Sequence, residues 1–287
     1  MAGARLMREP QGVDVKARAI RPSIESVANR LASSRVRHAD AWVPGRLIGG
    51  VALIAGSALW LIAMILRWAV LRNTPVSPEQ RAWLDEQPFA APGQLVAYAH
   101  DPNLVIAGYA TFAAACLVLI FGMFSFARMV AERSYLLGQV GGVVVVASLA
   151  ARLYFAGVEL TAFQLVDEIG LDAATRFVMD SYVELSYGLF YVPVTASAGA
   201  LVGGVLLSVG ALRAGTLGVI RCVLLLMWSW TFLGVLKESD AGSIQGAIAL
   251  CLVLIPIGIG QLSGKLQSLR TSSLPDQWTR SRAGWIW

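Results

Sequence analysis

Long apolar runs separated by shorter polar segments dominate the chain. An α-helix needs about 20 mainly apolar residues to cross a bilayer, and six runs reach this length. They cover residues 47–70, 104–127, 136–158, 185–211, 217–236 and 243–263. The pattern predicts an all-α polytopic membrane protein, built as a bundle of six transmembrane helices.

The overall composition agrees with this pattern. Hydrophobic residues make up 56% of the chain and charged residues 14%, whereas a soluble domain carries about 25% charged residues. The first 45 residues contain no apolar run of the kind found in a cleavable signal peptide. We therefore expect the run at 47–70 to act as an uncleaved signal anchor.

The distribution of basic residues predicts the orientation of the helices. If the N-terminus is cytoplasmic, the inner segments hold 17 Lys and Arg residues and the three outer loops hold four. Basic residues are retained on the cytoplasmic side of bacterial and eukaryotic membranes. The six runs are thus expected to place both termini in the cytoplasm, with the bacterial cytoplasmic membrane as the expected location.

Three regions follow from these boundaries: a basic tail at 1–46, a transmembrane domain at 47–264, and a basic, Trp-rich tail at 265–287. Apolar positions between 22 and 36 fall on one helical face, which predicts an amphipathic helix in the first tail. This helix either docks on an anionic leaflet or a partner protein, or belongs to a solvated tail that only sets the orientation.

Two polar segments interrupt the runs on the outer side. In the first, at 71–103, Ser77 and Pro78 predict the start of a short surface helix, which Pro88, Pro92 and Gly93 then end. The second, at 159–184, is expected to be an acidic loop with six Asp and Glu residues.

Further features are predicted within and beside these segments. Asp172, inside the acidic segment, is expected to cap a helix that begins at Ala173. In the first segment, His100 and Asp101 are neighbours that would either be solvated or touch a metal ion.

Pairs of glycines four residues apart mark candidate helix-packing faces, because small residues let two membrane helices approach closely. Gly138 and Gly142 form such a pair in the third run, and Gly199 and Gly203 form another in the fourth. The fourth run, with alanines beside its glycine pair, has the most pronounced face of this kind.

One group of polar residues is expected at the outer side of the bundle. Arg152 lies six residues before the end of the third run, roughly 9 Å below the surface at the helical rise. A charge at that depth is costly unless it pairs or reaches the interface. Glu159 shares its helix face, and Glu184 enters with the next run. The tyrosines that would line this group are Tyr154, Tyr182, Tyr187 and Tyr191.

Two interpretations of this group remain open. It forms either a binding pocket for a lipid headgroup, quinone, isoprenoid or peptide, or an ion pair of Arg152 with Glu159 or Glu184 that only fixes helix packing. Arg67, near the end of the first run and beside Trp68, is expected to extend to the interface instead.

The sequence lacks the residues that several kinds of site require. The two histidines lie outside the apolar runs, and the three cysteines are isolated in them. Haem or metal ligation by paired histidines in the bundle is therefore not expected, nor are a metal site or a disulfide framework. Nucleotide-binding and common hydrolase motifs are missing, and nucleic-acid binding is not expected. We predict no cofactor, although a bound lipid is compatible with the sequence.

Three functions are consistent with these features. The first is a non-catalytic structural or accessory subunit of a larger membrane complex, which has the bilayer and another membrane protein as partners. The second is an intramembrane enzyme or binding protein for a lipid or isoprenoid, in which Glu159 and Glu184 would act as acid and base. The third is a small-molecule carrier that uses helix breaks at Pro193 and Pro256.

Overall fold

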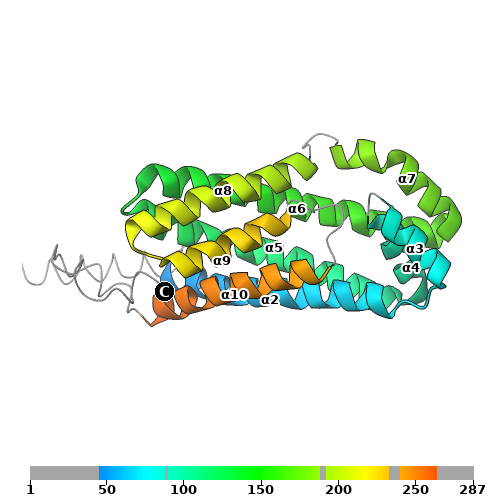
Figure 1. Cartoon of the computed structure of the whole chain (residues 1–287), viewed down its shortest axis with the longest axis horizontal. Coiled ribbons are helices and arrows are strands. Elements are labelled where there is room, and N and C mark those ends of the chain that lie inside the picture. The colour runs from blue at the N-terminus through cyan, green and yellow to red at the C-terminus, as the bar shows by residue number, and fades with distance from the viewer. Residues whose placement is uncertain (1–44, 88–89, 188–191, 233–239, 264–287) are drawn as a thin grey trace, which may run out of the picture.

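The computed structural model describes residues 45–87, 90–187, 192–232 and 240–263 (Figure 1), and the side chains of 181–187 and 192–194 are not described. Its regular secondary structure in these ranges is entirely helical. The helices are α2 (Arg46–Asn73), α3 (Pro78–Glu86), α4 (Ala91–His100), α5 (Pro102–Ala131), α6 (Tyr135–Ile169), α7 (Leu171–Tyr187), α8 (Val192–Ala214), α9 (Val219–Trp230) and α10 (Ala241–Leu262).

Five of these helices are long and apolar enough to cross a membrane: α2, α5, α6, α8 and α10. The expected run at 217–236 contains α9, whose 12 described residues extend only about 18 Å. The all-α character is therefore confirmed for the described residues, which contain five candidate spans.

The long helices and α9 form a closed ring. Along the ring, α2 packs on α5, α5 on α6, α6 on α8, α8 on α9, α9 on α10, and α10 back on α2. The helices run side by side along the long axis of the molecule (Figure 1). We call the end where α2 begins and α10 ends the basal end; Leu262 packs there beside Gly50.

Glycines bring neighbouring ring helices close together. Gly138 and Gly142 face α5, where an added Cβ would overlap Ala131 and Ala127 respectively. Gly199 and Gly203 face α6, and a Cβ on Gly203 would lie 2.8 Å from the backbone nitrogen of Val145. At each of these positions a larger side chain would push two helices apart.

Aromatic rings fill the interior of the ring. Trp60 stacks on Phe232, with ring centroids 5.6 Å apart, and also contacts Phe112 and Trp228 at 5.0 and 5.9 Å. All four side chains are at most 1% exposed. Tilted and offset ring contacts of this kind add to the dispersion that packs the interior.

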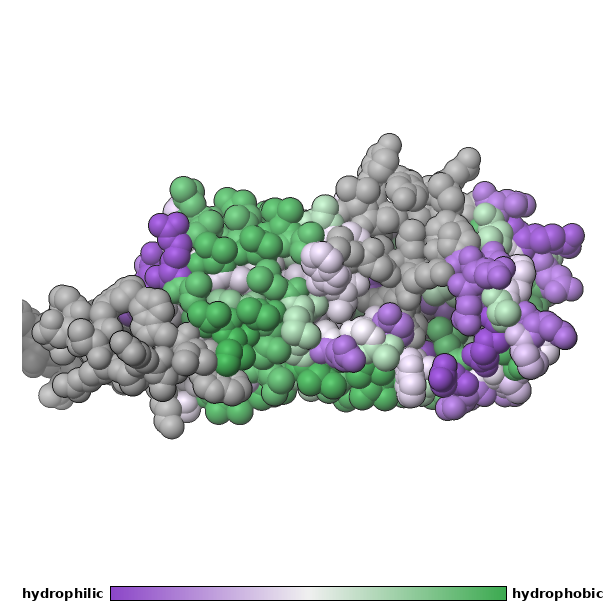
Figure 2. Space-filling view, viewed as in Figure 1, coloured by the Kyte–Doolittle hydropathy of each residue, from purple (hydrophilic) through white to green (hydrophobic). Residues whose placement is uncertain are grey.

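Beyond the ring, α3, α4, α7 and the adjoining ends of α2, α5 and α6 form a second layer, which we call the cap. It has its own apolar core, which includes Leu95, Phe163 and Val178. Figure 2 shows hydrophobic side chains over the ring region of the visible face and hydrophilic ones gathered over the cap. The cap therefore lies in a more polar environment than the ring.

The expected acidic loop at 159–184 is wrong, because α6 continues to Ile169 and α7 begins at Leu171. Gly170 joins the two helices with a φ of 81°, a conformation that glycine adopts without steric cost. The helix expected after Asp172 is present but begins at Leu171, so Asp172 lies in its first turn rather than at its N-cap.

The first outer segment is largely as expected. The Ser77 side chain accepts a hydrogen bond from the Gln80 backbone N–H at 3.1 Å and so caps α3. Helix α3 ends at Glu86, before these residues, as expected. Pro92 and Gly93, however, lie in the first turn of α4, where proline is tolerated. The tail segments at 1–44 and 264–287, with the expected amphipathic helix, lie outside the described residues.

Candidate functional site: a buried arginine–glutamate cluster

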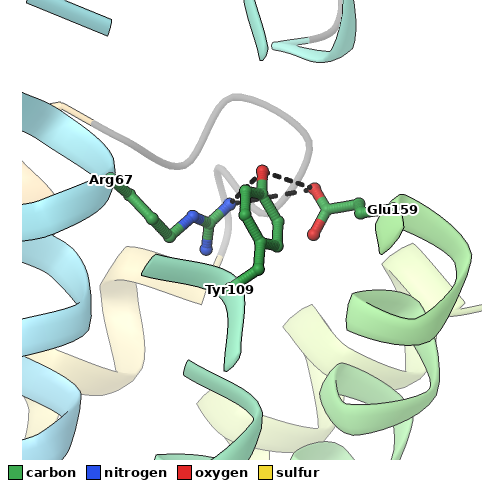
Figure 3. Close-up of polar contacts among 3 residues, drawn as sticks. All are labelled: Arg67, Tyr109 and Glu159. Carbon is green, nitrogen blue, oxygen red and sulfur yellow. Dashed lines mark hydrogen bonds and ion pairs between the residues drawn. The ribbon is translucent and has the colours of Figure 1, made fainter. Parts of the chain in front are cut away.

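An ion pair joins the ring helices α2 and α6 below the cap. Arg67 Nη2 lies 3.8 Å from Glu159 Oε1, and both side chains are almost fully buried. Tyr109, on α5, lies between them (Figure 3). Arg67 donates to the Tyr109 hydroxyl at 3.4 Å, and that hydroxyl donates to Glu159 at 3.4 Å. Three ring helices are thus joined by one set of polar contacts.

This group lies at the junction between the ring and the cap. Arg67 follows Arg46, the first residue of α2, by 21 positions, which corresponds to roughly 31 Å along the helix axis. The hydrocarbon core of a bilayer is about 30 Å thick. Measured from the basal end, the ion pair therefore lies close to the opposite membrane surface.

A second arginine, Arg152, lies on the face of α6 that also carries Glu159, but further from the cap. Arg152 is 1% exposed, and its guanidinium carbon is 4.8 Å from the centroid of the Phe112 ring and 5.7 Å from that of Phe232. The Arg67 guanidinium is 4.9 Å from the Phe112 centroid. Phe112 is therefore within cation–π distance of both arginines.

We call Arg67, Tyr109, Phe112, Arg152 and Glu159 the arginine–glutamate cluster. Two guanidinium groups and one carboxylate are removed from water here, and the desolvation of each charge is costly. The ion pair and the aromatic faces offset part of this cost. The arrangement is suited to holding α2, α5 and α6 in a fixed relative position.

The cap covers this cluster with α4. A small cavity lies between Arg67, Gln94 and Tyr109 and has a volume of about 10 Å³. A cavity of this size holds about one water molecule. This cavity therefore has no room for a substrate beside Arg67 and Tyr109.

The sequence-predicted residues take different positions. Arg152 and Glu159 are both buried on α6, as their shared face requires. Tyr154 is 42% exposed and lies on the outer side of that helix. The side chains of Glu184 and Tyr187 are outside the described part of α7, and Tyr191 lies outside the described residues altogether.

Three members of the cluster, Arg67, Tyr109 and Phe112, do not follow from the sequence analysis. The expectation that Arg67 extends to the interface is wrong, because the residue is 4% exposed and its side chain points into the ring. Tyr109 was not identified at all. A usable indication was present in the sequence, since Arg67 lies near the end of its apolar run and Tyr109 near the start of the next. Both polar side chains are therefore expected at the outer side of the predicted bundle.

The cap is held to α6 by a further polar contact. The Tyr98 hydroxyl of α4 donates to Asp167 Oδ2 at 2.6 Å, and its ring stacks on Phe163 with centroids 5.1 Å apart. The hydrogen bond to the Asp167 carboxylate raises the pKa of Tyr98 above its usual value. This contact fixes α4 above the arginine–glutamate cluster.

Within the described ranges, no three His, Cys, Asp or Glu side chains lie where they could share a metal ion. Comparisons with protein-family models, curated proteins and solved structures find no match to this chain.

Proposed function

We propose that this chain is a non-catalytic integral membrane protein that serves as an accessory or structural subunit of a larger complex in a bacterial cytoplasmic membrane. The observation that carries the proposal is the state of Glu159. This carboxylate is 5% exposed, paired with Arg67 and hydrogen-bonded by Tyr109. A group engaged in this way supports helix packing rather than proton transfer to a substrate.

A topology with six crossings is part of this proposal. Arg133, in the turn between α5 and α6, donates to the Ala214 carbonyl at the end of α8, so α9 starts at the basal end. At the other end of the ring, Asp240, which precedes α10, lines a cavity with Thr74 and Arg81. These two positions support a sixth crossing of the bilayer between α8 and α10, and the basic residues of the tails favour cytoplasmic termini.

The lipid-facing side of α6 supports the proposal that the chain binds a partner membrane protein. In the half nearer the cap, this side presents three small residues, Ala147, Ala150 and Gly157, together with Tyr154, and all four are exposed. A Cβ built on Gly157 meets no described residue within 4 Å. Small residues on an open helix face allow the close approach of another transmembrane helix.

The two other functions have less support. An acid–base enzyme would need Glu159 to be open to a substrate, whereas this residue is 5% exposed and is paired with Arg67. A carrier would use helix breaks that face an internal path, whereas Pro256 is exposed on the outside of α10.

Purification from the native membrane in a mild detergent, followed by native mass spectrometry, tests the proposal. We expect the 30.7 kDa chain to be recovered with a stoichiometric partner chain. The variant Gly157→Leu should lose that partner, because the larger side chain fills the open face. Val143→Leu, on the same side of α6 but nearer the basal end, is the matched control and should retain it. Recovery of the wild-type chain alone would contradict the proposal.

A further inference from the structure

Arginines gather at the basal end of the ring, opposite the cap. Among the described residues, the helix ends and turns of this end carry five arginines and one glutamate: Arg46, Arg128, Arg133, Arg213, Arg221 and Glu132. The two tail segments that continue the chain from this end hold 12 Lys and Arg residues and five Asp and Glu residues. Their charge adds to that of the described arginines, so the basal end is basic as a whole.

One of these arginines is fixed where the turn between α5 and α6 meets the end of α8. Arg133 Nη1 donates to the Ala214 carbonyl oxygen at 3.1 Å. This carbonyl belongs to the C-terminal end of α8, where the helix dipole favours a cation. A guanidinium group has five N–H donors, so the bond holds Arg133 in place and leaves further donors for an anionic group.

A second arginine, Arg213, directly precedes Ala214 in the chain. It is exposed, and within the described ranges its side chain makes no hydrogen bond or ion pair. Because Arg133 binds the residue that follows Arg213, the two guanidinium groups belong to one small surface and can bind the same anion. Figure 2 shows hydrophilic side chains at this end of the molecule, directly beside the hydrophobic surface of the ring.

The two arginines lie at the height of the lipid headgroups. The adjoining side chains of the ring are apolar and exposed, with Leu212 on α8 at 37%, Leu136 on α6 at 72% and Val219 on α9 at 48%. A change from exposed apolar to exposed basic side chains within one helical turn is typical of a membrane–water interface. An arginine at this level can lay its stem along the apolar surface and extend its charged group toward phosphates.

We propose that Arg133 and Arg213 bind the phosphate of an anionic phospholipid, with phosphatidylglycerol as the representative headgroup. Both guanidinium groups donate to the phosphate oxygens, for which their planar, forked geometry is suited. The acyl chains lie along exposed apolar side chains of α6 and α8, such as Val140 and Val209. Basic sites between transmembrane helices bind lipid headgroups in this way. The inference depends on the membrane location of the chain and not on a partner chain.

The surrounding charge distinguishes between headgroups. Phosphatidylethanolamine and phosphatidylcholine also contain a phosphate, but each adds a cationic group. That group would meet a basic surface whose described part contains a single carboxylate, that of Glu132. Helix α9, which starts beside this surface and has no acidic residue in its first turn, adds the positive end of a helix dipole. A glycerol headgroup adds no charge, so the surface favours phosphatidylglycerol.

The test uses the full chain reconstituted in vesicles with equal amounts of phosphatidylglycerol, phosphatidylethanolamine and phosphatidylcholine. Native mass spectrometry in mild detergent then measures which lipid stays bound. One basic residue near the surface contributes about fivefold in affinity for an anionic lipid. We therefore expect phosphatidylglycerol to be enriched about 25-fold over phosphatidylcholine by the two arginines. Equal retention of the three lipids would overturn the proposal and favour an acidic segment of a partner protein at this surface.

Two variants test the assigned contacts. Arg213→Gln should lower the enrichment about fivefold and leave the fold intact, because the side chain is exposed. Arg46→Gln is the matched control and should keep the enrichment. It removes the same charge from the same end of the molecule, but on α2, which does not adjoin α8 in the ring. An unchanged enrichment in Arg213→Gln, or an equal loss in Arg46→Gln, would show only the general positive field of this end and overturn the assignment.

Discussion

The ring and the cap are packed by different means. In the ring, glycines allow close helix contacts, aromatic rings fill the centre, and neutral groups form hydrogen bonds between helices. An example is Gln261 Nε2 donating to Ser125 Oγ at 2.8 Å. At the cap and its junction with the ring, charged groups take this role, as in the contacts of Glu159 with Arg67 and of Tyr98 with Asp167.

This difference follows from the solvent around each region. Lipid tails are as apolar as the side chains of the ring, so burial from lipid contributes little and close packing must hold the helices together. The cap extends beyond the length that the membrane covers, and there the hydrophobic effect stabilises an apolar core in the usual way. The arginine–glutamate cluster lies between these regions, where charges are least costly for a ring residue.

The largest effect is expected from removing the carboxylate of the cluster. Glu159→Ala leaves the buried guanidinium of Arg67 without its ion-pair partner, which typically costs about 3–5 kcal/mol. We expect this loss in the free energy of unfolding, measured by tryptophan fluorescence during denaturation by SDS in mixed micelles.

A double variant separates charge from packing at this site. Arg67→Met combined with Glu159→Leu removes both charges of the pair and should recover most of the lost stability, because apolar replacements of buried pairs are often neutral. If Glu159→Ala unfolds like the wild type, the pair behaves as a surface contact and the proposed role of the junction is incorrect.

A smaller effect is expected from closing a glycine contact in the ring. In Gly138→Ala the added Cβ overlaps the backbone of Ala131, and such overpacking costs about 1–3 kcal/mol. The same measurement of unfolding applies. Gly157→Ala is the matched control on the same helix, where the Cβ meets open space and alanine should stabilise the helix by about 0.5–1 kcal/mol. Equal effects of the two changes would show that glycine packing does not hold α5 against α6.

The smallest effect is expected in the cap. Tyr98→Phe keeps the ring that stacks on Phe163 and removes only the hydrogen bond to Asp167, for a loss of about 1 kcal/mol. Amide hydrogen exchange should show faster opening of α4, with the ring helices unchanged. Uniform acceleration over all helices would mean that cap and ring open as one unit.

The environment of Tyr98 also predicts that the free energy of unfolding depends on pH in the alkaline range. The pKa of Tyr98 is raised in the folded protein by its hydrogen bond to Asp167, so above about pH 10 the unfolded chain loses this proton first. The free energy of unfolding then falls as the pH rises, whereas below that pH both states stay protonated and the contribution is complete. In Tyr98→Phe this part of the alkaline decline should disappear.

Much of the local structure can be predicted from the sequence. The apolar runs, the N-cap of α3 at Ser77 and the helix that follows Gly170 depend on neighbours in the chain. The prediction of a loop at 159–184 is wrong because a group of charges is typical of loops but also occurs on helices in water. Here α6 continues into the aqueous cap and α7 follows it, so carboxylates such as those of Glu168 and Asp180 are exposed at little cost.

The sequence alone determined that the chain is helical and apolar enough for a membrane, because backbone hydrogen bonds in lipid must be satisfied within each segment. It also identified Arg152 and Glu159 as costly residues at a helix end. Only the tertiary structure decided that Glu159 pairs with Arg67 through Tyr109, because these residues come from three helices. The order of these helices around the ring and the rotation of each about its axis depend on side-chain packing along the whole length of the ring. No local sequence pattern encodes either property.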